Sequence, residues 1–115
     1  MIRHALFPPR IPSRPVAVGL MSGTSADAVS AVVARLSEHG SGASARILAE
    51  VHVPYPEPLR KRILAAQRSQ LADVCELSFE VAEAFAAAAI RAIRRGGVRP
   101  HFVASHGQTI RHVPR

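Results

Sequence analysis

The segment Ser22–Asp27 combines the residue types that bind phosphate and a divalent metal. It holds three hydroxyl residues, and Gly23 lets the backbone approach a ligand closely. Backbone N–H groups on a sharply turning segment can bind phosphate oxygens. One carboxylate together with phosphates and waters is a common way to hold Mg²⁺. Asp27 is the only acidic residue among the first 37. The segment therefore suggests a nucleotide site.

A plain hairpin turn accounts for the same residues, because Ser, Thr, Gly and Asp dominate turns through local hydrogen bonds. The segment is neither a GxxxxGK phosphate loop nor a GxGxxG fingerprint. It is not a serine nucleophile elbow either, since residues 19–23 read GLMSG rather than GxSxG. The residue pattern alone leaves both the turn and the phosphate loop open.

A second polar cluster, SHGQTIRHVPR, occupies residues 105–115. The amide of Gln108 and the hydroxyl of Thr109 can hydrogen-bond a sugar, and His106 can orient a substrate or a water. The cluster follows the short apolar run 102–104, and ligand sites in α/β sheets gather at the carboxyl ends of strands. We therefore expect a ligand-side loop directly after residue 104, with a polar surface loop as the alternative.

The histidines of this region do not predict a metal site. His101, His106 and His112 are separated by five and six residues, which matches no pair on one helical face. No cysteine or acidic residue follows Glu83.

Three predicted strands, two helices and a fourth strand must position the two polar segments. Apolar runs at 16–21 and 29–36 flank the first segment and predict a hairpin. After an expected loop at 38–44, residues 45–53 alternate apolar and polar side chains, as in a half-solvated antiparallel strand.

The helices are predicted from apolar spacing and from their terminal residues. Pro58 suits the first turn of a short helix. Apolar residues recur at three and four between Leu71 and Ile93, and Gly96 and Gly97 end that longer helix. The order strand, strand, strand, helix, strand predicts an α/β fold whose last strand returns parallel beside the first.

The composition fits a folded chain of 115 residues with 48% hydrophobic content and a core of aliphatic side chains. The formal net charge is +7, and every basic residue except Lys61 is arginine. A small basic nucleic-acid-binding module is one interpretation. An arginine-rich genome composition accounts equally for the net charge. Arginines that complement the dipoles at helix ends explain the basic residues better than a nucleic-acid patch does, because base-stacking aromatic residues are nearly absent, so we expect no nucleic-acid partner.

Residues 1–15 contain four prolines and no apolar stretch long enough for a signal peptide, and we interpret them as a flexible extension. No apolar run approaches the ~20 residues that cross a bilayer, so we expect a soluble protein without membrane contact. The single cysteine, Cys75, permits no internal disulfide; we expect it to be buried, in a protein of the reducing cytoplasm.

Both polar segments resemble the signatures of one enzyme family. GLMSGTSADAVS at 19–30 is similar to the GxMSGTSxDGxD hairpin of anhydro-N-acetylmuramic acid kinases, and HGQTIRHVP at 106–114 is similar to their HGQTxxHxP segment. The motifs stand in the family's order and cover about residues 16–114. The family belongs to the sugar kinase, Hsp70 and actin superfamily. The resemblance implies a ribonuclease H-like core, with residues 16–115 as part of an N-terminal actin-like ATPase domain.

The resemblance also implies a reaction and its cofactors. The family opens the 1,6-anhydro ring of anhydro-N-acetylmuramic acid with water and phosphorylates O6, using ATP and Mg²⁺, during cell-wall recycling. ATP-phosphate contacts are implied for Ser22, Gly23, Thr24, Ser25, Ala26 and Asp27, with Asp27 holding Mg²⁺ directly or through water. A substrate-side loop is implied for His106, Gly107, Gln108 and Thr109. A homodimer is left open for the full-length enzyme.

Two residues depart from the family signature, since Ala28 stands in place of a glycine and Ser30 in place of an aspartate. We expect Ala28 to be strained by ~1 kcal/mol or more at a position that needs positive φ. A degenerate, non-catalytic relative therefore remains an alternative. A catalytic base and an adenosine pocket are expected from sequence beyond these residues. We expect the chain to be an N-terminal fragment without kinase activity of its own.

Overall fold

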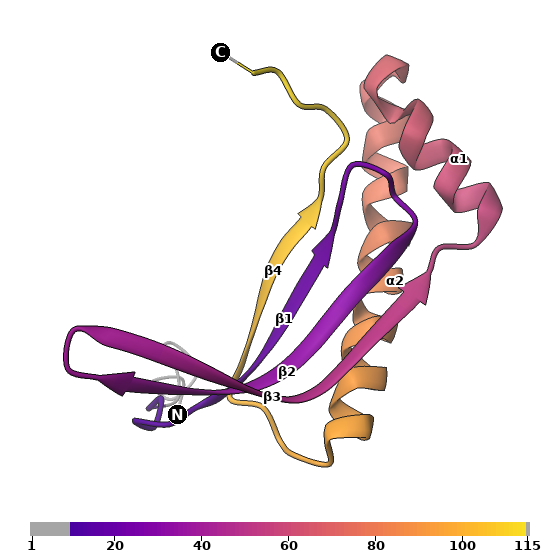
Figure 1. The fold of residues 1–115 in the computed structure, drawn as a ribbon. Coiled ribbons are helices and arrows are strands. Elements are labelled where there is room, and N and C mark those ends of the chain that lie inside the picture. The colour runs from indigo at the N-terminus through magenta and orange to yellow at the C-terminus, as the bar shows by residue number, and fades with distance from the viewer. Residues whose placement is uncertain (1–9, 115) are drawn as a thin grey trace, which may run out of the picture.

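A computed structural model describes residues 10–114 and shows a single four-stranded sheet (Figure 1). The sheet order is β3-β2-β1-β4, and the strands are β1 (Val16–Ser22), β2 (Ala28–His39), β3 (Gly42–Pro54) and β4 (Phe102–Gln108). The first three strands form an antiparallel meander, and β4 lies parallel to β1. The predicted mixed α/β sheet with a returning parallel strand is confirmed.

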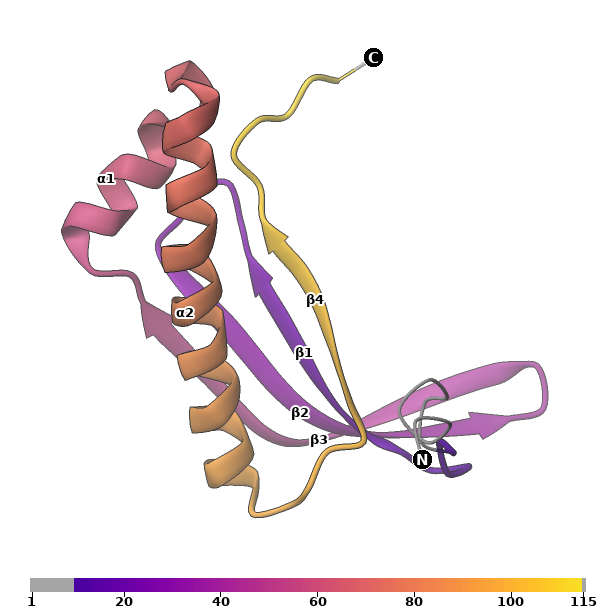
Figure 2. The ribbon, with the colours of Figure 1, turned by 180° about the vertical axis from the view of Figure 1, so that it is seen from behind.

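The hairpin of β2 and β3 is longer than the sequence predicted. We expected a loop at 38–44, but strand pairing continues to His39 and Gly42 and leaves only residues 40 and 41 as the turn. Gly40 adopts φ +56°, a conformation open to glycine, and so allows this tight connection. The end of the hairpin projects beyond the body of the sheet (Figure 2).

The N-terminal segment contacts this projecting hairpin. The Leu36 N–H donates to the Pro15 carbonyl at 2.8 Å, and Arg14 Nε donates to Ser37 Oγ at 3.2 Å. Of the extension predicted at 1–15, residues 1–9 lie outside the part of the chain that the structure describes.

Two helices lie on one face of the sheet (Figures 1 and 2). Helix α1 (Glu57–Ala65) begins after two prolines, continues into a 3₁₀ turn (Ala66–Arg68), and is followed by the long helix α2 (Leu71–Gly96). Gly97 ends α2 with φ +63°, and its N–H donates to the Ile93 carbonyl at 3.0 Å. The predicted long helix and its glycine stop are confirmed. No helix in residues 10–114 is long and apolar enough to cross a membrane.

The core lies between α2 and the sheet face that it covers. Alternate residues of the central strands point toward the helix and are almost fully buried, as are the small residues of α2; they include Val16, Val18, Leu20, Ala31, Val33, Ala88 and Ala92. Small side chains let helix and sheet approach closely, which agrees with the predicted aliphatic core. The prediction of a buried Cys75 was wrong: it is exposed, because it lies outside the apolar stripe of α2 that faces the sheet.

Candidate functional site

The two polar segments meet at the carboxyl ends of β1 and β4. Ser22 of β1 pairs with Gln108 of β4. The two segments are distant in sequence, since 85 positions separate Gln108 from Gly23, the residue after Ser22. The Gln108 side-chain amide Nε2 donates a 2.9 Å hydrogen bond to the Gly23 carbonyl and a 3.0 Å hydrogen bond to the Thr109 carbonyl. The fold therefore brings the hydroxyl-rich loop and the HGQT segment into direct contact.

The HGQT segment continues a strand where the sequence predicted a loop. We expected a loop directly after residue 104, but β4 runs on through Gln108, so only Thr109 of the four predicted site residues follows the strand. The pairing of β1 with β4 shifts between Leu20 and Ser22, where β4 carries one more residue. Gly107 lies at this bulge with φ +77°, and its N–H donates to Ser105 Oγ at 3.1 Å. The bulge keeps Gln108 in register with Ser22.

Tyr55 joins the same contact from the end of β3. Its hydroxyl donates to Gln108 Oε1 at 3.0 Å, and its backbone N–H donates to the Asp27 carbonyl at 3.1 Å. Burial raises the pKa of the Tyr55 phenol, and the neighbouring Ser22 hydroxyl opposes this shift. Because no hydrogen bond of good geometry reaches Ser22 Oγ within residues 10–114, we take its contact with Tyr55 to be weak. Both ends of the Gln108 amide are thus engaged within the chain.

The loop between β1 and β2 is closed by a tight turn. The Ala26 N–H donates to the Gly23 carbonyl at 3.1 Å, and Ala26 is fully buried with φ +50°. An alanine in this left-handed region costs roughly 1–2 kcal/mol. The expectation of strain at Ala28 was wrong, because Ala28 is the first residue of β2 and pairs with Pro54 in extended conformation. The left-handed residue of this loop is therefore Ala26.

The second departure from the family signature, Ser30, lies within β2 rather than in the loop. Its hydroxyl is 2.9 Å from His52 Nδ1 on β3, and His52 Nε2 is 3.1 Å from Glu50. These side chains lie on the sheet face away from the helices, because the flanking residues Val29 and Ala31 point into the core.

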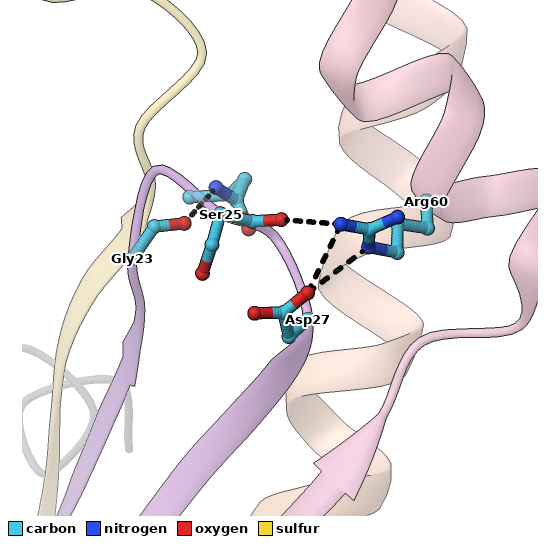
Figure 3. A network of polar contacts seen from close by, with 5 residues as sticks. Gly23, Ser25, Asp27 and Arg60 are labelled. Carbon is cyan, nitrogen blue, oxygen red and sulfur yellow. Dashed lines mark hydrogen bonds and ion pairs between the residues drawn. The ribbon is translucent and has the colours of Figure 1, made fainter.

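Arg60 of α1 binds the loop through its guanidinium group, a contact that the sequence did not predict (Figure 3). Its Nη2 lies 3.0 Å from Asp27 Oδ1 and donates to the Ser25 carbonyl at 3.2 Å, and its Nε donates to Asp27 Oδ1 at 3.2 Å. The sequence signal was weak, because 33 residues separate the partners. Another arginine of α1, Arg62, pairs with Glu80 of α2.

A sequence model of the family "anhydro-N-acetylmuramic acid kinase" matches residues 15–115. The chain belongs to this kinase family. The family resemblance predicted from the two motifs is confirmed.

Proteins named anhydro-N-acetylmuramic acid kinase are similar to most of the chain. The protein of Streptomyces avermitilis is 43% identical over 99 residues, which cover 83% of this chain and 26% of that protein. The protein of Salinibacter ruber is 40% identical over 110 residues, covering 89% of this chain and 27% of that protein. The protein of Caldanaerobacter subterraneus is 34% identical over 103 residues, which cover 84% of this chain and 26% of that protein. The chain spans about a quarter of the length of these kinases.

The loop of this kinase-family chain has room and polar groups for a phosphate. Gly23, Thr24 and Ser25 are exposed, and a Cβ placed on Gly23 would meet no atom within 4 Å. Among the described residues, the N–H groups of Thr24 and Ser25 donate to no backbone or side-chain acceptor. These residues fit a phosphate group.

A metal would depend on a single carboxylate here. Within residues 10–114 no cluster of three or more His, Cys, Asp or Glu side chains could hold a metal ion. Asp27 Oδ1 faces Arg60, while Asp27 Oδ2 has no partner in the described part of the chain and the side chain is 68% exposed. This arrangement fits Mg²⁺ carried by nucleotide phosphates and waters, with Asp27 as its protein ligand.

Two cavities flank the Gln108 contact. The larger, of about 520 Å³, lies between α2 and β4 and is lined mainly by apolar side chains such as Leu77, Val81 and Phe85. The smaller, of about 250 Å³, lies between the loop, α1 and the segment after β4, and its lining includes Thr24 and Thr109. The smaller cavity alone touches both the hydroxyl-rich loop and the residues after β4, so it is the better position for a polar substrate.

Proposed function

We propose that this chain forms the phosphate-binding hairpin and part of the sugar side of an ATP-dependent anhydro-N-acetylmuramic acid kinase. In this reaction water opens the 1,6-anhydro ring, the γ-phosphoryl group of ATP passes to O6, and ADP leaves. The observation that carries the proposal is the hydrogen bond from Gln108 to the Gly23 carbonyl, because it joins the two family motifs at one end of the sheet.

Each part of the loop has a proposed task. The N–H groups of Thr24 and Ser25 and their hydroxyls hold phosphate oxygens, as backbone N–H groups do in other anion-binding turns. Asp27 holds Mg²⁺ or its waters. When bound, Mg·ATP supplies the phosphoryl group and neutralises the charge that builds up on it. Asp27 shares its carboxylate with Arg60, so it is poorly suited to remove a proton from the attacking water.

The remaining machinery is proposed to come from polypeptide beyond these residues. The relatives are about four times as long as the matched segment, and phosphoryl transfer needs a water-activating base and an adenosine pocket. We propose that residues 16–115 form part of a ribonuclease H-like, actin-like ATPase domain of a cytoplasmic enzyme of cell-wall recycling. The strand order β3-β2-β1-β4 supports this fold.

A chimeric enzyme tests this function. Residues 15–115 replace the matched quarter of the Streptomyces avermitilis kinase, and phosphorylated sugar is measured by mass spectrometry with and without ATP and Mg²⁺. We expect ATP-dependent and Mg²⁺-dependent phosphorylation by the chimera, and none by the 115-residue chain alone. A matched Asp27→Asn chimera should lose most of the activity. A chimera that folds and binds ATP but forms no product, beside an active parent, contradicts the proposal.

A further inference from the structure

We infer that the cavity beside Thr24 is a carboxylate-binding subsite in which Arg111 binds the acid group of the sugar substrate. This inference rests on the proposed kinase function and adds a specificity residue to it. We call this space the Arg111 cavity; it is lined by Thr24, Ile63, Leu64, Gln67, Thr109, Ile110, Arg111 and His112.

The position of the Arg111 cavity suits a phosphate acceptor. Thr24 belongs to the loop proposed to hold ATP phosphates, and Thr109 directly follows the strand that carries Gln108. A molecule in the cavity therefore lies beside the loop. A kinase needs such proximity, because the acceptor must be held close to the phosphoryl group that it receives.

The charge of the cavity favours an anion. Its lining contains one arginine, one histidine and no acidic residue. In residues 10–114 the Arg111 guanidinium makes no ion pair, whereas Arg60 and Arg62 are both paired with carboxylates. Asp27, the acidic residue of the adjoining loop, faces Arg60. An unpaired guanidinium at a pocket is a strong receptor for a carboxylate or a phosphate, because its planar fork matches both groups.

The other walls of the cavity suit a sugar ring. Ile63, Leu64 and Ile110 contribute apolar side chains to the lining, while Gln67 and the two threonines offer groups that hydrogen-bond hydroxyls. The volume of about 250 Å³ lies just below the roughly 300–1,000 Å³ of sites for drug-sized ligands, which suits a single ring. Apolar walls with few polar groups are typical of small-molecule sites.

Arg111 could bind an oxyanion from either of two sources, a sugar carboxylate or an ATP phosphate. We assign the sugar carboxylate for two reasons. The open N–H groups of Thr24 and Ser25 already provide a phosphate site, and the apolar wall of Ile63 and Leu64 faces the same cavity as Arg111. Arg111 is not a fixed position of the HGQTxxHxP signature, so the motif alone does not assign it a role.

The test compares an acidic and a neutral sugar on the full 115-residue chain. Ligand-observed NMR titrations are made with 1,6-anhydro-N-acetylmuramic acid, with 1,6-anhydro-N-acetylglucosamine, which lacks the lactyl carboxylate, and with Mg·ATP. We expect Arg111→Gln to weaken binding of the acidic sugar about tenfold or more. Binding of the neutral sugar and of Mg·ATP should stay within about twofold, and Arg111→Lys should restore part of the loss.

The matched control is Arg95→Gln, because Arg95 lies in the last turn of α2, and this end of α2 is opposite the end near α1 and the cavity (Figure 1). It removes the same charge and should leave all three titrations unchanged. Thermal unfolding of each variant checks that the fold is retained.

Three results would each overturn the subsite. They are no detectable binding of the acidic sugar to the unmodified chain, equal loss for both sugars in Arg111→Gln, and loss of Mg·ATP binding instead, which would show that Arg111 binds phosphate. The proposed function is judged separately, by product formation in the chimera. An active chimera with unselective sugar binding refutes the subsite alone, and an inactive chimera with Arg111-dependent binding refutes the kinase function alone.

Discussion

The side-chain amide of Gln108 donates a 2.9 Å hydrogen bond to the carbonyl of Gly23, so one side chain connects the HGQT strand to the hydroxyl-rich loop. The same amide also accepts a 3.0 Å hydrogen bond from Tyr55 through its oxygen. A primary amide can do both, because it carries a donor nitrogen and an acceptor oxygen. We therefore expect Gln108 to position the loop, while the sugar is contacted by its neighbours.

Replacing Gln108 by Glu separates these two contacts. A glutamate oxygen can still accept from Tyr55, but an ionised carboxylate cannot donate to the Gly23 carbonyl. We expect Gln108→Glu to lower the free energy of unfolding by about 1–3 kcal/mol, because the Gly23 carbonyl loses one of its two donors and the Thr109 carbonyl loses the Gln108 amide. Urea unfolding at neutral pH measures this change. Gln67→Glu serves as the control, and an equal loss in both variants contradicts a specific role for Gln108.

Arg60 is expected to affect the order of the loop more than the stability of the fold. Its ion pair with Asp27 is partly exposed, at 31% and 68% for the two side chains, and such pairs contribute roughly 0–1 kcal/mol. We therefore expect Arg60→Ala to lower the free energy of unfolding by no more than about 1 kcal/mol. Hydrogen exchange of the Ala26 N–H, which donates to the Gly23 carbonyl, should become several-fold faster, because its neighbours Ser25 and Asp27 lose a shared partner.

Arg60→Lys provides the comparison for this prediction. Lysine keeps the positive charge but lacks the planar fork that reaches the Ser25 carbonyl and the Asp27 carboxylate together. Compared with Arg60→Ala, we expect Arg60→Lys to restore the free energy of unfolding fully and the protection of the loop from hydrogen exchange only partly. Unchanged hydrogen exchange in both variants would show that the loop is rigid without Arg60.

Replacing Ala28 by the glycine of the family signature should lower the stability of the fold. Ala28 lies in β2 with extended backbone, where glycine costs roughly 0.5–1 kcal/mol relative to alanine through its greater freedom in the unfolded chain. We expect Ala28→Gly to lower the free energy of unfolding by about this amount, measured in urea. Ala26→Val should cost more, because a β-branched side chain is strained further at φ +50°. A stabilising Ala28→Gly substitution would place the strain at residue 28 after all.

The sequence predicted the sheet order and the long helix because both depend on local patterns. Alternation along β3 and the three-and-four spacing of α2 each specify an element, and the general preference for a parallel return places β4 beside β1. One motif follows β1 and the other lies at the end of β4. Because these two strands are parallel neighbours, the strand order places both motifs at the same end of the sheet.

The details of the site could not be read from the sequence because they depend on contacts between distant residues. No local pattern shows that Gly107 forms a bulge that brings Gln108 opposite Ser22, or that positive φ falls on Ala26 rather than on Ala28. Arg60 and Tyr55 are ordinary helix and strand-end residues until the fold brings them to the loop. Such partners are recognised only once the tertiary structure is known.

Tyr55 makes the stability of the fold depend on pH in the alkaline range. Burial raises the pKa of its phenol above the ordinary value of 10.0, so the folded chain keeps this proton to higher pH than the unfolded chain does. The resulting stability is fully present below about pH 10 and is lost as pH rises through the folded-state pKa. Tyr55 is the single tyrosine of the chain, so phenolate absorbance reports its titration directly.

Tyr55→Phe separates this effect from other alkaline titrations. At neutral pH the free energy of unfolding of the variant should be about 1–3 kcal/mol lower than that of the unmodified chain, because Gln108 Oε1 is left without its donor. From pH 9 to roughly pH 11 its unfolding free energy should fall less steeply than that of the unmodified chain, since no phenol remains to ionise. Urea unfolding across this range measures both slopes. Equal slopes would show that Tyr55 ionises equally in both states, and burial of the phenol would then have no part in the alkaline transition.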